Sequence, residues 1–296
     1  MRAQAFSKAP ASTRPRLLSA LNIVVSAPVV ALAALFFALV AASAIFAPWL
    51  APHDPLQLMP SLRLSPPSAD FPLGADAFGR DLLSRILYGG RISLLLGVSS
   101  AVVSISIGLA IGLVSGFFKW VDAVLMRIMD GLMAIPSILL AIAVVSISGA
   151  SVKTVLVAIT IPEVPRVARL VRSIVLTARV EPYVEAAISV GTSLHKILWR
   201  HLMPNAIAPL IVQGAFICAS AILTEAILSF VGAGISPETP SWGNIMAEGR
   251  SFFQLKPSLI FWPGLVLSAT ILSINVLGDA ARDALDPRMK QRESGT

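Results

Sequence analysis

Long stretches without charged side chains limit the folds open to this chain more than any other feature. Residues 27–47 contain no Asp, Glu, Lys or Arg, and some 21 residues are enough to cross roughly 30 Å of hydrocarbon as a helix. Lipid offers no hydrogen-bond partner to the backbone, so such a run is stable as a helix. Further mainly apolar segments lie at about 92–118, at 123–145, from 154 onward, at 206–230 and at 258–277. The pattern predicts an all-α polytopic membrane protein with six transmembrane helices.

The composition excludes an ordinary soluble domain. Hydrophobic residues make up 56% of the 296 residues and charged residues only 13%, about half of the usual share in soluble proteins. The net charge of +7 raises the possibility of a nucleic-acid partner, but the basic residues cluster at the ends of the apolar segments and in loops. This is the pattern that membrane topology produces, so no nucleic-acid partner is expected. Cys218 is the single cysteine, which excludes an intrachain disulfide.

The basic residues also predict the orientation in the membrane. Residues 1–26 contain four basic residues and no acidic one, which indicates a cytoplasmic N-terminal arm followed by an uncleaved first span. The loop after the fourth span is predicted to be cytoplasmic because it and the preceding helix contain Arg166, Arg169, Arg172, Arg179, Lys196 and Arg200. An alternative joins residues 132–161 into one span. It leaves five crossings and places this loop outside, which the six basic residues disfavour.

The predicted organisation follows from these spans. A cytoplasmic arm (1–26) and the first transmembrane helix (27–47) precede a proline-rich external loop (48–91), a core of five further transmembrane helices (92–280) and a cytoplasmic tail (281–296). Residues 79–89 are expected to form a separate helix that lies flat at the outer membrane surface. Its apolar residues fall on one side, and Asp81 and Arg85 are spaced to form an ion pair on the other.

Two features of the spans are candidates for packing or transport roles. Gly108, Gly112 and Gly116 recur every four residues, which predicts a smooth helix face that another helix can approach closely. Glu225 is an ionisable residue deep in an apolar run. It is expected either to line or gate a pathway or, as an equally favoured alternative, to bond to a neighbouring helix near the outer boundary.

The motifs of common enzymes are absent from the sequence. It contains no Gly-x-x-x-x-Gly-Lys-Ser/Thr phosphate loop and no His-Glu-x-x-His pair, and its three histidines have no metal-ligand partner at useful spacing. No catalytic residue, metal site or cofactor is therefore expected in this chain.

Residues 181–205 form a polar segment with helix-forming residues between two apolar segments. Pro182 suits a first helical position, Gly191 a helix end and Ser193 the start of a second helix, which Pro204 is expected to close. The prediction is a pair of short helices at the membrane surface. Small residues on this pair leave room for a docking partner.

The same stretch resembles a known motif. Glu185-Ala186-Ala187, then Gly191, then His201 to Pro204-Asn205 resemble the cytoplasmic "EAA" loop of ABC importer permeases. The resemblance continues through segments 71–94, 225–243 and 278–288, which are similar to the dipeptide, oligopeptide and nickel permeases of the "C" type. In that family the loop is the coupling helix that docks on the ATPase subunit.

The resemblance implies a type I ABC importer permease in the bacterial cytoplasmic (inner) membrane, with both termini inside. Its expected partners are a sister permease in a heterodimer, two ATPase subunits that bind ATP and Mg, an extracytoplasmic solute-binding protein and the lipid bilayer. The expected cargo is a di- or oligopeptide, with nickel or another small solute as the alternative. An ion-coupled secondary transporter is the alternative of another class, but it would need several ionisable groups near the middle of the membrane.

Overall fold

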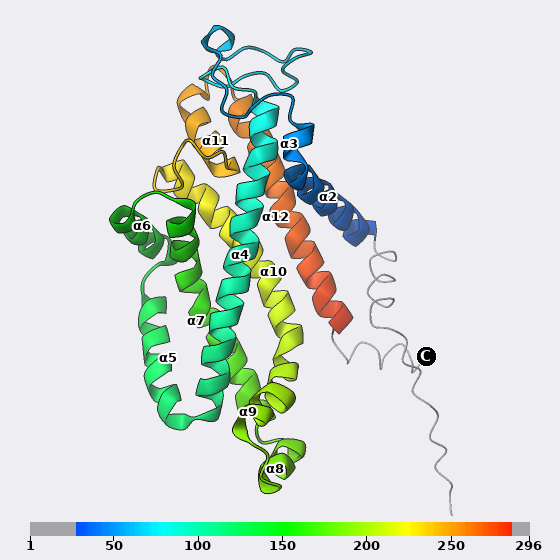
Figure 1. The fold of residues 1–296 in the computed structure, drawn as a ribbon, viewed down its shortest axis with the longest axis vertical. Helices are drawn as coiled ribbons and strands as arrows, with labels where there is room; N and C mark the ends of the chain where they lie inside the picture. Colours follow the sequence, from blue (N-terminus) through cyan, green and yellow to red (C-terminus); the bar gives the residue numbers. More distant parts are fainter. Residues whose placement is uncertain (1–27, 286–296) are drawn as a thin grey trace, which may run out of the picture.

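The computed structural model describes residues 28–285, and these residues form a long helical bundle (Figure 1). The predicted arm at 1–26 and most of the predicted tail at 281–296 lie outside the described residues. The longer helices are α2 (Pro28–Ile45), α4 (Leu82–Phe117), α5 (Lys119–Ala134), α6 (Ser137–Ser148), α7 (Val152–Ala178), α10 (Met203–Val231) and α12 (Ser258–Leu285). The short elements are α3 (Ala47–Leu50), η1 (Pro60–Leu62), α8 (Pro182–Ser189), α9 (Leu194–Lys196), η2 (Ile197–Leu202), α11 (Trp242–Gly249) and η3 (Arg250–Phe252).

Four helices among the described residues are long and apolar enough to cross a membrane: α2, α4, the continuous helix from α9 to the end of α10, and α12. A fifth crossing, or a re-entrant loop, is formed by α5 and α6, which are bent by 89° at their junction. Pro136 lies at this junction as the N-cap of α6, and a proline interrupts the backbone hydrogen bonds of a continuous helix. Since α6 ends at Ser148 and α7 begins at Val152, residues 132–161 are not one helix.

The fourth predicted span, from residue 154 onward, corresponds to α7, which differs from the others in carrying charged residues along its length. Its 27 residues give a length of about 40 Å, enough to cross the hydrocarbon. One side of α7 is buried through Val167, Val171 and Val175. These valines face α4, and the pair forms the centre of the bundle, with α10 beside it (Figure 1).

The α4–α7 contact depends on the three regularly spaced glycines. A Cβ atom on Gly108 would lie 2.5 Å from Cβ of Val167, and one on Gly116 would lie 2.6 Å from Cβ of Val175. Gly112 occupies the same position relative to Val171. The glycine face expected from the sequence is therefore the surface against which α7 lies.

The predicted separate helix at 79–89 is wrong. Residues from Leu82 onward are the first turns of α4, which runs without a break to Phe117. Asp81 caps this helix, because its side chain accepts a hydrogen bond from the backbone N–H of Ser84 at 2.8 Å. The apolar residues Leu82 and Ile86 are buried in the bundle, so this segment packs against protein.

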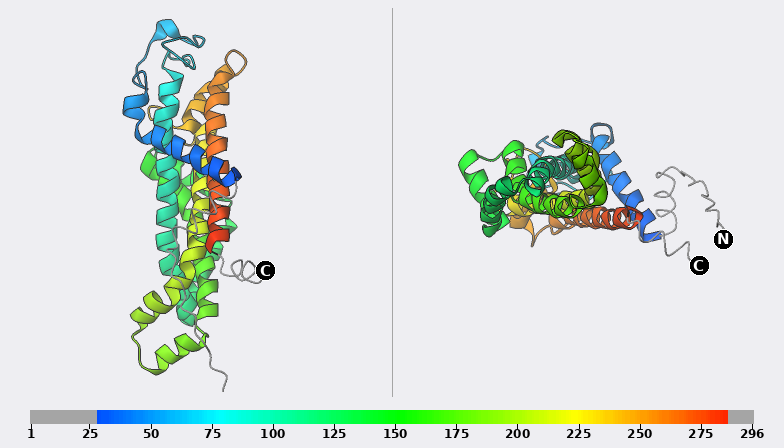
Figure 2. Two further views of the ribbon diagram at one scale, coloured as in Figure 1. Left: turned by 90° about the vertical axis from the view of Figure 1, so that its right-hand side faces the viewer. Right: turned by 90° about the horizontal axis from the view of Figure 1, so that it is seen from below.

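The last span is also longer than predicted, since α12 continues to Leu285 and includes residues that the sequence assigned to the tail. The helix α12 stops short of α8, which lies at one end of the bundle, and α11 with the loop at 51–81 occupies the opposite end (Figure 1). Seen from the side, α2 crosses the bundle obliquely (Figure 2). It contacts α12 and α4.

Candidate functional site

The α8 end of the bundle is formed by a short helix whose two ends are determined by the local sequence. Pro182 occupies the first turn, where its missing N–H costs nothing. Gly191 has φ +81°, the left-handed conformation that commonly ends a helix. The N–H of Thr192 then donates to the carbonyl of Ala187 at 3.0 Å, which closes the turn. Because a Cβ on Gly191 would meet nothing within 4 Å, its conformation rather than crowding requires glycine here.

Most of α8 is open to solvent. Val184 is fully buried and belongs to the same apolar cluster as Ile197 and Leu202, which fixes the helix on the bundle. Glu185, Ala186 and Gly191 are exposed and Ala187 is half-buried. Several large apolar side chains beside them are also exposed: Val180, Tyr183, Ile188, Val190 and Trp199. We call α8 with these apolar residues and Gly191 the docking surface, after the role that the sequence predicts for it.

His201, Pro204 and Asn205, predicted as part of the same site, have a different position. The side-chain N–H of Asn205 donates to the Tyr183 hydroxyl at 3.1 Å and to the carbonyl of His201 at 2.7 Å. The rings of Tyr183 and His201 lie 6.2 Å apart. This part of the motif therefore attaches α8 to the start of α10, while Glu185, Ala186 and Gly191 remain open.

The prediction that Pro204 closes a second short helix is wrong. The helix that begins after Ser193 continues without a break to Val231, a length of 38 residues. The turn before Pro204 is π-helical, residues Ile197–Leu202. A π turn widens the helix and changes its hydrogen-bond register, so a proline that lacks an N–H can be accommodated at the start of α10.

Glu225 is located near the other end of α10. Its carboxylate is fully buried and accepts hydrogen bonds from Ser229 and Ser241, each at 2.8 Å, and from Ser93 of α4 at 3.4 Å. These hydroxyls come from three parts of the chain, so Glu225 joins α10 to α4 and to the start of α11. This geometry is the helix-bonding alternative that the sequence left open, and a pathway role for Glu225 stays a prediction.

Comparison with known proteins identifies the family. The model of the family described as "binding-protein-dependent transport system inner membrane component" matches residues 104–291. The chain belongs to this family. It is therefore a membrane permease of a bacterial ABC importer, placed in the inner membrane.

The names of several similar proteins refer to transport of peptides or glutathione. The permease is 50% identical over 239 residues to a probable peptide ABC transporter permease protein of Sinorhizobium fredii, with 81% of this chain and 82% of the relative covered. It is 41% identical over 263 residues to the di/tripeptide transport system permease protein DppC of Pseudomonas aeruginosa, with 86% and 87% covered. It is 42% identical over 260 residues to the glutathione transport system permease protein GsiD of Pectobacterium atrosepticum, with 87% and 86% covered.

A solved structure shares the fold of the permease. An inward-facing structure of the MetNI methionine ABC transporter matches with a TM-score of 0.53 at 20% identity, covering 69% of this chain and 98% of the matched chain. This similarity supports the type I importer permease fold.

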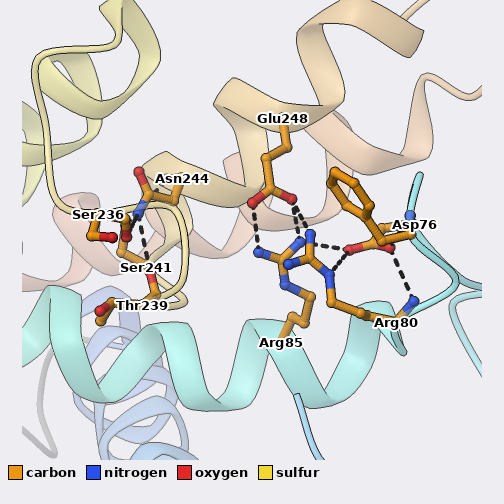
Figure 3. Close-up of polar contacts among 9 residues, drawn as sticks. Asp76, Arg80, Arg85, Ser236, Thr239, Ser241, Asn244 and Glu248 are labelled. Atoms are coloured by element: carbon orange, nitrogen blue, oxygen red, sulfur yellow. Dashed lines mark hydrogen bonds and ion pairs between the residues drawn. The ribbon is translucent and has the colours of Figure 1, made fainter. Parts of the chain in front are cut away.

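The permease also contains an ionic cluster at the end opposite the docking surface, which sequence reasoning missed (Figure 3). Arg85 of α4 donates to Asp76 at 2.6 Å and to both carboxylate oxygens of Glu248 of α11 at 2.6 and 3.0 Å. Arg80 bonds to the same two carboxylates. Asp81, the expected partner of Arg85, instead caps α4. Two cations and two carboxylates thus balance each other and attach α11 to α4.

Two more contacts hold the loops at this end. The side chain of Asn244 in α11 donates to the backbone carbonyls of Ser236 and Thr239 at 3.1 and 3.0 Å, which fixes the loop between α10 and α11 (Figure 3). Lys256 is buried and donates to the carbonyl of Ala75 at 2.8 Å. Burial lowers the pKa of Lys256, and the nearby negative charge of Asp76 opposes this shift.

Proposed function

We propose that this permease imports short peptides, which an extracytoplasmic solute-binding protein delivers to the outer end of the bundle. The relatives named above support peptide as the cargo, since their names refer to peptide, di/tripeptide and glutathione transport. Glutathione is itself a small peptide. The family description supports the binding protein as a partner, because it refers to binding-protein-dependent transport.

The energy source in this proposal is a pair of ATPase subunits, which bind ATP and Mg and hydrolyse the nucleotide. This chain has no phosphate-loop motif, so the nucleotide sites belong to partner subunits. The observation that carries the proposal is the docking surface, where small and apolar side chains are exposed on a helix that is firmly attached to the bundle. A second permease of similar fold completes the translocation path as a heterodimer.

The orientation follows from the same surface. We place the docking surface and both termini in the cytoplasm, and α11 with the loop at 51–81 outside. The basic residues support this orientation, because Arg169 and Arg172 lie on the part of α7 that leads to α8 and Arg179 directly follows α7.

Thiol crosslinking tests the docking and the orientation together. In a Cys218→Ala background, Ala187→Cys should crosslink to an ATPase subunit, and the yield should change with ATP. Leu58→Cys is the matched control, because Leu58 is exposed and belongs to the loop at 51–81, which occupies the opposite end of the bundle. It should react with an impermeant reagent from outside and give no ATPase crosslink. Labelling of Ala187→Cys from outside would overturn the proposed orientation.

The cargo is tested by uptake. Proteoliposomes that contain both permeases, the ATPases and the binding protein should accumulate a labelled dipeptide when ATP is supplied inside. Accumulation driven by a proton gradient without ATP, or uptake of nickel and not of the dipeptide, would refute the proposed function.

A further inference from the structure

The helices α7, α10 and α12 leave a hollow of about 310 Å³ between them, and half of the ten residues that line it are polar. Its polar side chains come from all three helices: Glu163 and Arg166 from α7, Gln213 and Ser220 from α10, and Asn275 from α12. Gln213 also lines a larger hollow of about 640 Å³ that extends to Asn205 at the docking-surface end. The two hollows therefore adjoin along one side of α10.

The smaller hollow lies deep along the bundle. Glu163 is eleven residues from the start of α7 at Val152, which places it about 16 Å along a helix of about 40 Å. Gln213 is ten residues from the start of α10 at Met203, about 15 Å from the opposite end. Polar and ionisable groups at such depth are costly and usually face a partner or an aqueous path.

The two charged residues are paired but not fully enclosed. Glu163 is only 5% exposed, whereas the Arg166 side chain is 48% exposed, and Nη1 of Arg166 lies 2.7 Å from Oε1 of Glu163. This bond joins one carboxylate oxygen to one guanidinium nitrogen. The second oxygen and the other guanidinium N–H groups are chemically able to bind a ligand. Pro162 and Pro165 lie on either side of Glu163 and remove two further backbone N–H donors from the helix.

We propose that this hollow binds the charged ends of a peptide during its passage, an inference that rests on the peptide import proposed above. Glu163 accepts hydrogen bonds from the peptide ammonium group and Arg166 donates to the peptide carboxylate. The side-chain amides of Gln213 and Asn275 pair with the peptide bond. When a zwitterionic peptide binds, the single Glu163–Arg166 ion pair is replaced by two ion pairs, one between Glu163 and the peptide ammonium group and one between Arg166 and the peptide carboxylate. No net charge is then left uncompensated inside the membrane.

The same chemistry disfavours a metal ion as the ligand. A divalent cation would be bound by a single carboxylate that is already neutralised, with the Arg166 charge close by. Oxygen-rich or imidazole sites bind such ions because they supply several donors and no competing cation. The Glu163–Arg166 pair is thus suited to a zwitterion.

Transport by the complete reconstituted complex provides the first test. Arg166→Gln and Glu163→Gln should each lower the dipeptide molecules transported per ATP by about tenfold, as expected when a hydrogen bond to a charged group is lost. Arg169→Gln is the matched control on the same helix, since Arg169 pairs with Asp130 of α5 and does not line the hollow. It should stay within about twofold of the unmodified protein, because exposed ion pairs contribute little.

Two results would separate this proposal from the proposed function. If the unmodified complex hydrolyses ATP in response to the binding protein but transports no dipeptide, the proposed function fails. If it transports dipeptide and the Arg166→Gln complex does so at the same ratio to ATP, the hollow is not a peptide site and the pair is only structural.

A second test measures protection of a cysteine by the peptide. It does not use Glu163→Gln, so it does not depend on whether that variant folds. In nanodiscs, Ser220→Cys in a Cys218→Ala background should react with a water-soluble thiol reagent, and dipeptide during ATP turnover should slow the reaction. Trp120→Cys, an exposed position outside the hollow, should react equally with and without dipeptide. Adding Arg166→Gln should abolish the protection of Ser220→Cys. Equal protection with and without Arg166 would overturn the proposal.

Discussion

The contact between α4 and α7 allows a quantitative prediction for Gly112→Ala. A Cβ atom on Gly112 would lie 2.5 Å from Cβ of Val171 and 2.7 Å from the carbonyl oxygen of Ala168. Ordinary contacts of this kind begin at 3.4 Å, so the two helices must separate locally by about 1 Å. The neighbouring atoms are a Cβ and a backbone oxygen, neither of which can rotate away.

The expected cost follows from two opposing terms. Overpacking a tight contact costs about 1–3 kcal/mol, whereas Gly to Ala within a helix gains about 0.5–1 kcal/mol. We therefore expect Gly112→Ala to destabilise the permease by about 1–2 kcal/mol. Gly131→Ala in α5 is the matched control, because a Cβ there would meet nothing within 4 Å, and it should stabilise by about 0.5–1 kcal/mol.

The measurement is unfolding of the purified permease in mixed detergent micelles, followed by circular dichroism as the denaturing detergent is increased. Val171→Ala should not rescue Gly112→Ala, because alanine keeps the Cβ atom that causes the clash. If Gly112→Ala were as stable as Gly131→Ala, or if Val171→Ala restored its stability, the close packing described for these helices would be refuted.

Three further predictions concern the two ends of the bundle. Gly191→Ala should reduce ATP-driven transport in the uptake assay without changing the stability of the spans. The reason is that alanine adopts the left-handed conformation of Gly191 at a cost of about 1–2 kcal/mol, which disturbs only the end of α8. Gly191→Asn should lose less transport, because asparagine tolerates this conformation better. Arg85→Met should destabilise the protein by about 3 kcal/mol in the detergent unfolding assay, since it leaves two carboxylates with one arginine; no change would contradict the ionic cluster. Tyr183→Phe should cost about 1 kcal/mol and Asn205→Ala somewhat more, because Asn205 also donates to the carbonyl of His201. The double variant should cost less than the sum, because both substitutions remove the same Tyr183–Asn205 hydrogen bond; strict additivity in the same assay would show that this bond does not form.

Much of the fold could be predicted from local sequence patterns. Apolar runs place the helices α2, α4, α10 and α12, since the length of a run matches the thickness of the hydrocarbon. The four-residue spacing of glycines identified the face of α4 that meets α7, because that face is a property of one helix. The break at Pro136 was also predictable from the chemistry of a single residue.

Features that depend on distant parts of the chain were not predictable in this way. The partner of Arg85 is Glu248, which lies 163 residues further along the sequence, and no local spacing indicates it. A local rule paired Arg85 with Asp81 instead. The continuity of the helix through Pro204 was missed for a similar reason, because the π turn before it depends on how Ile197 and Leu202 are buried.

The candidate site was recognised in part. The residues around Gly191 were identified correctly as an exposed helix end, since the glycine conformation is a local property. The attachment by Asn205 and Tyr183 was not, because it joins residues that are 22 positions apart. Glu163 was also overlooked, although Pro162 and Pro165 on either side of it are a local signal of an unusual helix position.

The unbroken helix from Leu194 to Val231 makes α10 a lever with the docking surface at one end. Its 38 residues span roughly 57 Å, and Glu225 lies about 46 Å from the Leu194 end. A tilt of about 10° pivoted at that end would displace Glu225 by about 8 Å, given this helix length. Glu225 is hydrogen-bonded to Ser241 at the start of α11, so a small change of tilt at the docking surface would become a large displacement at the opposite end of the protein.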